Sequence, residues 1–217
     1  KIKEKKPCSV GISATTYALP ASTTLCERLR KEFPDLLIIL GGAHANVAGM
    51  HAAVNIPSVD IVSYHPEGEG VTLSLMQSYS KHNHNRKSFL KDTNELKKIK
   101  GIIFRENGVI TKTNPGEVIK DLDFLPLPAR DLFPLEKYIP LPNQYKRLPL
   151  ANMIVIRGCP YVCTFCDQAA TTARRRSPQK VVDEIKELVA KYGVKEISFW
   201  DDTMSYHKKW MKEFCSL

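Results

Sequence analysis

The run of five apolar residues at positions 36–40, Leu-Leu-Ile-Ile-Leu, constrains the fold of this chain most strongly. A strand without polar alternation has both faces buried, which is typical of a parallel sheet covered by helices on both sides. The run leads directly into Gly41 and Gly42. A short strand at 9–13 and a helix at 22–33 precede it, and Pro34 ends that helix. These features predict an α/β fold.

The alternation continues along the first half of the chain. Leu25, Leu29 and Phe33 recur at a spacing of four and predict one buried face for the helix at 22–33. A weak helix near 47–54, a strand at 59–63 and a helix at 67–80 follow; the last has acidic residues at its start. The order strand, helix, strand, helix, strand, helix predicts an open layer with a parallel sheet.

Two further segments complete the first half. Residues 80–98 are polar and lack clear periodicity, so we expect an exposed loop there. Residues 101–113 contain two runs rich in β-formers around Asn107-Gly108. This dipeptide tolerates the positive φ angles of a tight turn, so the segment predicts a β-hairpin.

A proline-rich stretch separates this pattern from a second one. Residues 121–149 contain six prolines, which remove amide donors and block regular helix, so we expect an ordered linker. A strand at 152–158 follows, then a helix with Ser177 as N-cap and Gly193 as its stop. A strand at 194–200 and a helix start near Tyr206 come next. This order resembles the opening of a parallel βα barrel, where the chemistry lies on loops after the strands.

Composition excludes some classes of protein. The chain of 217 residues has 43% hydrophobic residues, enough for a buried core, but no apolar run of the roughly 18–20 residues that cross a bilayer. No signal peptide opens it, so we interpret it as cytoplasmic. The first residue is Lys rather than Met, so we expect a piece of a longer protein. We interpret the net charge of +9 as a solvated basic surface rather than a nucleic-acid site, although it could also attract an anionic substrate.

Three of the six cysteines lie within eight positions, at Cys159, Cys163 and Cys166. Without an export signal, this clustering favours a metal site over disulfides. Three thiolates can hold three corners of an iron–sulfur cube and leave one iron open for a further ligand, because such clusters normally take four cysteines. A redox dithiol or half of a zinc knuckle also fits the C-x-x-C part. A redox dithiol leaves Cys159 unexplained. A zinc knuckle needs a second pair of ligands, which the chain lacks.

The stretch from Gly158 to Cys166, with an aromatic residue before the third cysteine, resembles the signature of radical S-adenosylmethionine (SAM) enzymes. The segments around 174–185 and 196–204 resemble the subgroup with an N-terminal cobalamin-binding domain. In the first half, the segments around 10–16, 38–46 and 67–70 resemble later strands of that domain, and 121–138 resembles its usual linker. The resemblance covers nearly the whole chain.

The resemblance implies a 4Fe–4S cluster on Cys159, Cys163 and Cys166, with SAM on the open iron. It implies that Asp201 and Asp202 meet the SAM amino group, although a pair of acids at a helix N-terminus fits equally well. It also implies cobalamin as a methyl carrier, and an electron donor such as flavodoxin or ferredoxin. The substrate would be a small molecule.

Further cofactor-binding residues follow from the same resemblance. Phe165 would pack near the adenine of SAM, or simply anchor its loop. On the cobalamin side, hydroxyl groups, glycines and acids follow the strand ends, where ligands of open α/β sheets bind. The expected residues there are Ser13, Thr15, Thr16, Gly41, Gly42, Glu67 and Glu69. Ordinary turn glycines and capping hydroxyls would look the same.

We therefore expect a Rossmann-like (flavodoxin-like) cobalamin-binding domain at 1–119, lacking its first strands, a proline-rich linker at 120–149 and the start of a radical SAM partial TIM barrel at 150–217. The expected function of the parent protein is a cobalamin-dependent radical SAM methyltransferase, with this piece alone inactive. The alternatives are an oxidative cyclase of the Mg-protoporphyrin monomethyl ester type and a non-catalytic cobalamin- or zinc-binding module.

Overall fold

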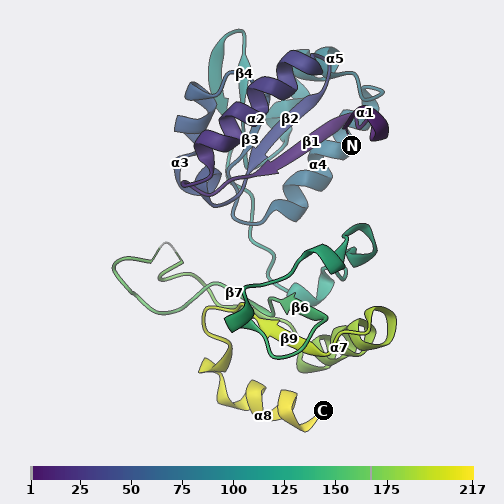
Figure 1. Ribbon diagram of the computed structural model, residues 1–217. Helices are drawn as coiled ribbons and strands as arrows, with labels where there is room; N and C mark the ends of the chain where they lie inside the picture. The colour runs from purple at the N-terminus through teal and green to yellow at the C-terminus, as the bar shows by residue number, and fades with distance from the viewer. Residues whose placement is uncertain (1, 167) are drawn as a thin grey trace. The chain divides into compact units, whose positions relative to one another are not determined.

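The computed structural model describes residues 2–166 and 168–217. The chain forms two compact units, one up to Val118 and one from Ile119 onward. Each unit has its own hydrophobic core, so each is described separately (Figure 1).

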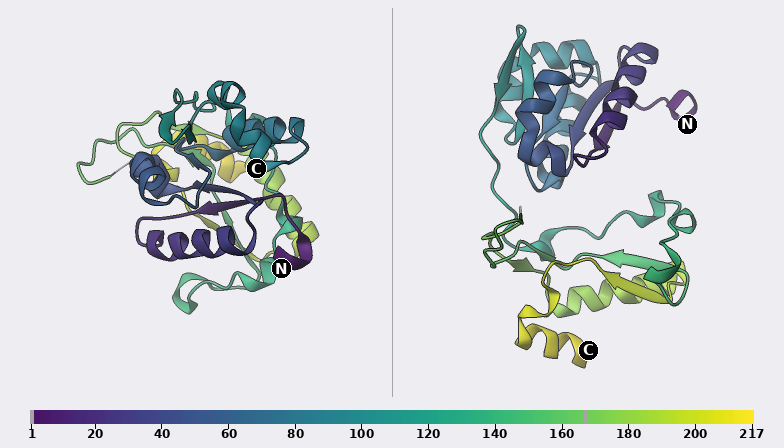
Figure 2. Two further views of the ribbon diagram at one scale, coloured as in Figure 1. Left: turned by 90° about the horizontal axis from the view of Figure 1, so that it is seen from above. Right: turned by 60° about the vertical axis from the view of Figure 1, so that its left-hand side comes forward.

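The first unit is a three-layer α/β structure whose sheet has the order β1-β2-β3-β4-β5. The first three strands are parallel, whereas β4 and β5 form an antiparallel hairpin at one edge (Figure 2). The elements are α1 (Ile2–Lys5), β1 (Ser9–Ser13), α2 (Leu19–Glu32), β2 (Leu37–Gly41), α3 (Ala43–Asn55), β3 (Ile61–Ser63), α4 (Gly68–Lys81), α5 (Arg86–Lys91), α6 (Thr93–Lys98), β4 (Ile102–Glu106) and β5 (Val109–Lys112). The parallel prediction is therefore correct for three strands, and the whole sheet is mixed.

Side chains of β2 alternate between two cores, as its unbroken apolar sequence predicts. Ile38 and Leu40 pack with residues of α2 and α3, such as Cys26 and Ala52. Leu37 packs on the other face, with residues of α4, α5 and α6. Burial on both faces confirms the prediction drawn from positions 36–40.

Two predictions for this unit are wrong. Residues 80–98 form α5 and α6 instead of a loop, because Asn85 and Asp92 accept hydrogen bonds from backbone amides as N-caps and each helix buries one apolar side chain, Phe89 and Leu96. In α2 the prediction fails at Leu25, which is 46% exposed, while Cys26 is fully buried; Leu29 is buried and Phe33 packs against the core as predicted.

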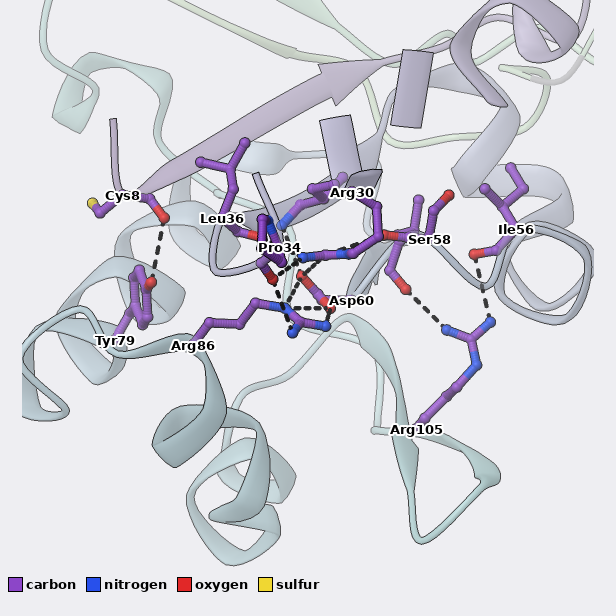
Figure 3. A network of polar contacts seen from close by, with 12 residues as sticks. Cys8, Arg30, Pro34, Leu36, Ile56, Ser58, Asp60, Tyr79, Arg86 and Arg105 are labelled. Carbon is purple, nitrogen blue, oxygen red and sulfur yellow. Dashed lines mark hydrogen bonds and ion pairs between the residues drawn. The ribbon is translucent and has the colours of Figure 1, made fainter. Parts of the chain in front are cut away.

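A buried ion network joins the helices to the amino ends of β2 and β3. The Asp60 carboxylate lies 2.6 Å from guanidinium nitrogens of both Arg30 of α2 and Arg86 of α5 (Figure 3). The amide of Ile38 donates to the same carboxylate at 2.9 Å. Every member has a partner, so removing any one of them would leave an uncompensated charge at the edge opposite the carboxyl ends of the strands.

The second unit begins with four short 3₁₀ turns in the proline-rich stretch. A parallel pair, β6 and β9, and a small antiparallel pair, β7 and β8, follow, and α7 and α8 pack on one face of β6–β9 (Figure 2). The elements are η1 (Leu122–Phe124), η2 (Arg130–Leu132), η3 (Leu135–Lys137), η4 (Pro142–Gln144), β6 (Leu150–Met153), β7 (Ile156–Arg157), β8 (Arg174–Arg175), α7 (Pro178–Tyr192), β9 (Glu196–Phe199), η5 (Met204–Tyr206) and α8 (Lys208–Ser216).

The predicted caps of α7 are confirmed. The Ser177 side chain accepts a hydrogen bond from the amide of Lys180, and Gly193 ends the helix in the left-handed conformation. The single strand predicted at 152–158 is wrong, because the chain breaks into β6 and β7 around Ile154. An aspartate distant in sequence causes this break, as described next.

Candidate functional site

The cysteine loop follows β7 and returns through β8, held at its stem by one threonine. Thr171 accepts a hydrogen bond from the Cys159 amide on its hydroxyl at 2.8 Å, and its own amide donates to the Cys159 carbonyl at 3.0 Å. Gly158 has a φ of +84°, and a Cβ there would collide with the carbonyl of Thr172. The sequence therefore fixes where the loop begins and ends.

The three clustered cysteines are free thiols that differ in solvent exposure. Cys159 is buried at the stem, Cys166 is half-buried and Cys163 is exposed. Within residues 2–166 and 168–217, no group of three His, Cys, Asp or Glu side chains could hold a single metal ion. A cluster places each cysteine on a different iron, so the thiols need not meet at one ion. Three free thiols on one loop fit a cluster by the chemistry of the donors.

Phe165 lies on this loop and is 91% exposed. It does not anchor the loop to any part of the chain that the structure describes. Its ring is therefore available for contact with another molecule, which fits the adenine-side role implied by the resemblance.

Asp201 lies directly after β9 and explains the break between β6 and β7. Its Oδ1 accepts hydrogen bonds from the amides of Val155 at 2.7 Å and Ile156 at 2.5 Å. Oδ2 is buried and has no hydrogen-bond partner among the residues described. Burial raises the pKa of the Asp201 carboxyl, while the backbone hydrogen bonds oppose that shift. Asp202, its neighbour, is exposed.

The basic run at 174–176 has half-buried side chains, each with a partner in the second unit. Arg174 donates to the carbonyl of Ile119 at 2.6 Å. Arg175 donates to the hydroxyl of Tyr206 and lies over its ring, 5.1 Å from the centroid. Arg176 pairs with a buried acid of α7, Glu184.

In the first unit, the expected cobalamin residues after β1 and β2 lie at one edge of the sheet. Gly42 has a φ of +90°, and a Cβ there would lie 2.5 Å from the Ser13 hydroxyl and 2.8 Å from the amide nitrogen of Ala14. Only glycine permits this approach of the two loops without strain. Gly41 ends β2 half-buried, and a Cβ there would make only ordinary contacts.

His44, at the start of α3, lies buried beside this edge. Its Nδ1 is 3.2 Å from the Thr16 hydroxyl, and its ring is 5% exposed. Its Nε2 is buried and has no hydrogen-bond partner among the residues described. Thr15 accepts a hydrogen bond from the Ala18 amide and orders the same loop. An unsatisfied ring nitrogen at a strand-end edge fits a ligand with polar groups.

The acids after β3 differ from each other in environment. Glu67 is 5% exposed and immediately precedes α4, whereas Glu69 is exposed in the first turn of that helix. His65, which no sequence pattern singled out, is buried beside them, and its Nδ1 lies 2.9 Å from the Glu67 carbonyl oxygen. A Cβ on Gly116 would come within 3.2 Å of the His65 ring, so that glycine makes room for the histidine.

Comparison with known proteins gives the setting for both units. Residues 153–217 match the model of the Radical SAM superfamily. An uncharacterised methyltransferase of Pyrococcus horikoshii is 31% identical over 211 residues, which are 96% of this chain and 42% of that protein. The anaerobic magnesium-protoporphyrin IX monomethyl ester cyclase of Rubrivivax gelatinosus is 32% identical over 218 residues, 99% of this chain and 37% of that protein.

The fold is also found among solved structures. The cobalamin-dependent SAM radical enzyme OxsB with aqua-cobalamin bound gives a TM-score of 0.70 at 16% identity, over 99% of this chain and 29% of that one. These matches confirm the resemblance that the cysteine motif predicted. The chain spans about two-fifths of the length of the curated relatives it matches. In the part of the chain that the structure describes, no helix is long and apolar enough to span a membrane.

Proposed function

We propose that this chain, whose residues 153–217 match the Radical SAM superfamily, comes from a cobalamin-dependent radical SAM methyltransferase. We assign residues 1–119 to a Rossmann-like cobalamin-binding domain, 120–149 to a linker and 150–217 to the start of a partial βα barrel. The substrate is a small molecule with an unactivated centre, the protein works in the cytoplasm, and flavodoxin or ferredoxin supplies electrons.

The observation that carries this proposal is the cysteine loop on the carboxyl side of a β-strand. Cys159, Cys163 and Cys166 are free thiols on a loop whose stem is tied at Thr171. In the proposal they hold a 4Fe–4S cluster with one open iron, and Phe165 contacts the adenine of SAM. When bound and reduced, such a cluster supplies the electron that splits SAM into methionine and a 5′-deoxyadenosyl radical.

The remaining residues of this chain orient and enclose the cofactors. Asp201 holds the two amides that precede the loop, so it fixes the direction in which the cysteines leave the strand. In the proposal the exposed carboxylate of Asp202 meets the ammonium group of SAM, and the buried, unpartnered second oxygen of Asp201 adds negative charge beside it. Opposite charge makes that contact favourable.

On the cobalamin side, the proposed contacts lie at the carboxyl ends of β1, β2 and β3. The Gly41-Gly42 pair keeps side chains away from this edge, and His44 offers a buried ring nitrogen. The full set that we assign to cobalamin from the sequence is Ser13, Thr15, Thr16, Gly41, Gly42, Glu67 and Glu69.

Anaerobic reconstitution with iron and sulfide tests the proposal. The full-length parent should become brown, bind about four irons per chain and release 5′-deoxyadenosine from SAM after reduction. Replacing each clustered cysteine by alanine should abolish both properties, whereas replacing the exposed Cys215 should leave them unchanged. A colourless protein with one zinc would reject the proposal in favour of a non-catalytic module.

A second candidate keeps the radical chemistry and changes the product. The Rubrivivax relative is a magnesium-protoporphyrin monomethyl ester cyclase at similar identity, so oxidative cyclisation is the second candidate, although the methyltransferase relatives favour methylation. SAM labelled in its methyl group separates the two reactions. Transfer of label to the product supports methylation, and an unlabelled ring-closed product supports cyclisation.

A further inference from the structure

A cavity of about 500 Å³ lies within the second unit, beside β6. This volume is in the range of small-molecule sites. Its wall combines the 3₁₀ turns of the proline-rich stretch with the end of β6 and the residue after β9. The lining side chains used below are Arg130, Phe133, Tyr138, Ile154, Arg176, Glu184 and Trp200.

One wall carries two arginines on a single carboxylate. Glu184 of α7 is 2% exposed, and its Oε1 lies 2.5 Å from Nη1 of Arg130. Its Oε2 pairs with Nη1 of Arg176. Both guanidinium side chains are 11% exposed. The triad therefore holds an excess of one positive charge in a largely desolvated place.

The arginines also retain donor capacity. Besides Glu184, Arg130 reaches the carbonyl of Asn152 and Arg176 that of Lys180, both at 3.4 Å, near the long limit for a hydrogen bond. Each guanidinium has five N–H donors in a planar fork that matches a carboxylate or phosphate. A buried excess charge is costly unless an ion of opposite sign compensates it.

The remaining lining side chains used here are aromatic or aliphatic and are called the aromatic wall. Phe133, Tyr138, Ile154 and Trp200 are each more than half exposed. An apolar body placed against them would remove this surface from water, which is favourable.

We propose that this cavity binds an organic anion, with a carboxylate or phosphate on the Arg130–Arg176 pair and an apolar body against the aromatic wall. Its role as the substrate site rests on the proposed function. Binding of the anion itself requires no cluster, SAM or cobalamin, so it is tested without them.

The test is calorimetric titration of the chain, free of cofactors, with 4-phenylbutyrate and with the matched neutral alcohol 4-phenyl-1-butanol. We expect the acid to bind at least about tenfold more tightly than the alcohol, since only its charged head can make charge-assisted hydrogen bonds to the arginines. Equal affinity for the two probes, or no binding of the acid, would overturn the proposal.

Variants locate the site. Arg130→Gln should weaken binding of the acid about tenfold or more, whereas Arg28→Gln, on the exposed face of α2 in the other unit, should change nothing. Glu184→Gln should instead tighten binding of the acid, because the substitution removes the carboxylate that competes for the arginines. Damage to the fold would have the opposite effect and weaken binding. If the circular dichroism of Arg130→Gln differs from that of the parent, Ile154→Trp is used instead. Ile154 is 59% exposed, so the bulkier tryptophan should fold normally, fill part of the cavity and weaken binding of the acid. Unchanged affinity in folded Glu184→Gln and Ile154→Trp would reject the site.

The outcomes separate this proposal from the proposed function. Selective binding of the acid by a protein that cannot hold iron supports the cavity and rejects the radical chemistry. A protein that loads iron and cleaves SAM but binds acid and alcohol equally rejects the cavity alone.

Discussion

Replacing Asp201 by alanine should destabilise the second unit by an amount that its two backbone hydrogen bonds set. The carboxylate accepts from the amides of Val155 and Ile156 at 2.7 and 2.5 Å. Hydrogen bonds to charged groups contribute about 1.5–3 kcal/mol each. Asp201 is half-buried, so water can bond to part of the freed backbone amides in the variant. We therefore expect Asp201→Ala to lower the free energy of unfolding by about 2–3 kcal/mol in total.

The asparagine variant and a neighbouring acid provide the controls. Burial raises the pKa of Asp201, so its native environment tolerates a neutral side chain. Asp201→Asn keeps an oxygen acceptor and should lose less than about 1 kcal/mol. Asp202→Ala removes an exposed acid and should change stability by at most about 0.5 kcal/mol.

Urea unfolding of the full chain followed by tryptophan fluorescence measures these differences. Both tryptophans of the chain, Trp200 and Trp210, lie in the second unit, so their signal reports on it. With a slope of about 1–2 kcal/mol per M, Asp201→Ala should lower the midpoint by roughly 1–3 M. Amide hydrogen exchange at Val155 and Ile156 should accelerate in Asp201→Ala alone. Equal midpoints for Asp201→Ala and Asp202→Ala would refute the reasoning.

Three other predictions follow from local geometry. Gly42→Ala should destabilise the first unit by about 1–3 kcal/mol in thermal unfolding because of its positive φ and close contacts, whereas Gly68→Ala, with open space around it, should not destabilise it. Lysine hydrogen bonds lower the pKa of Glu95 to about 2, so its stabilising contribution is complete above pH 4.5 and lost as pH falls toward 2; Glu95→Gln should unfold with a weaker dependence on pH over that window. Burial raises the pKa of Cys26 to about 11, so mass spectrometry after iodoacetamide treatment at pH 8 should find Cys8 alkylated and Cys26 intact, and fast labelling of Cys26 would contradict its burial.

Features that depend on nearby residues could be predicted from the sequence. The Ser177 and Gly193 caps set the limits of α7, and Asn107-Gly108 makes the β4–β5 turn with positive φ at both positions. The two-faced burial of β2 follows from its unbroken apolar run, because no polar residue interrupts it. In each case a few adjacent positions carry the whole physical signal.

Features that depend on distant residues could not be predicted. The break between β6 and β7 depends on Asp201, more than forty positions later in the chain. Helices α5 and α6 are too short for a periodic pattern, since each buries a single apolar side chain. Arg130 and Arg176 come from separate segments that meet at Glu184. Only their side-chain types were visible in sequence, without a pattern linking them.

The roles of the site residues stay predictions, and the residues differ in how far the sequence could reveal them. The cysteine motif was recognisable because ligand spacing within one loop is a local property. His44 and His65 gave no such signal, because a single histidine on a helix or loop is ordinary in sequence. Their burial at the strand-end edge of the first unit is a property of the fold.

Counting iron and acid-labile sulfide in oxygen-free protein tests the central claim most directly. With Cys159, Cys163 and Cys166 intact, reconstituted protein should hold about four of each per chain, and an alanine at any of the three should remove them. Protein that takes up neither iron nor sulfide while all three thiols are reduced would contradict the account.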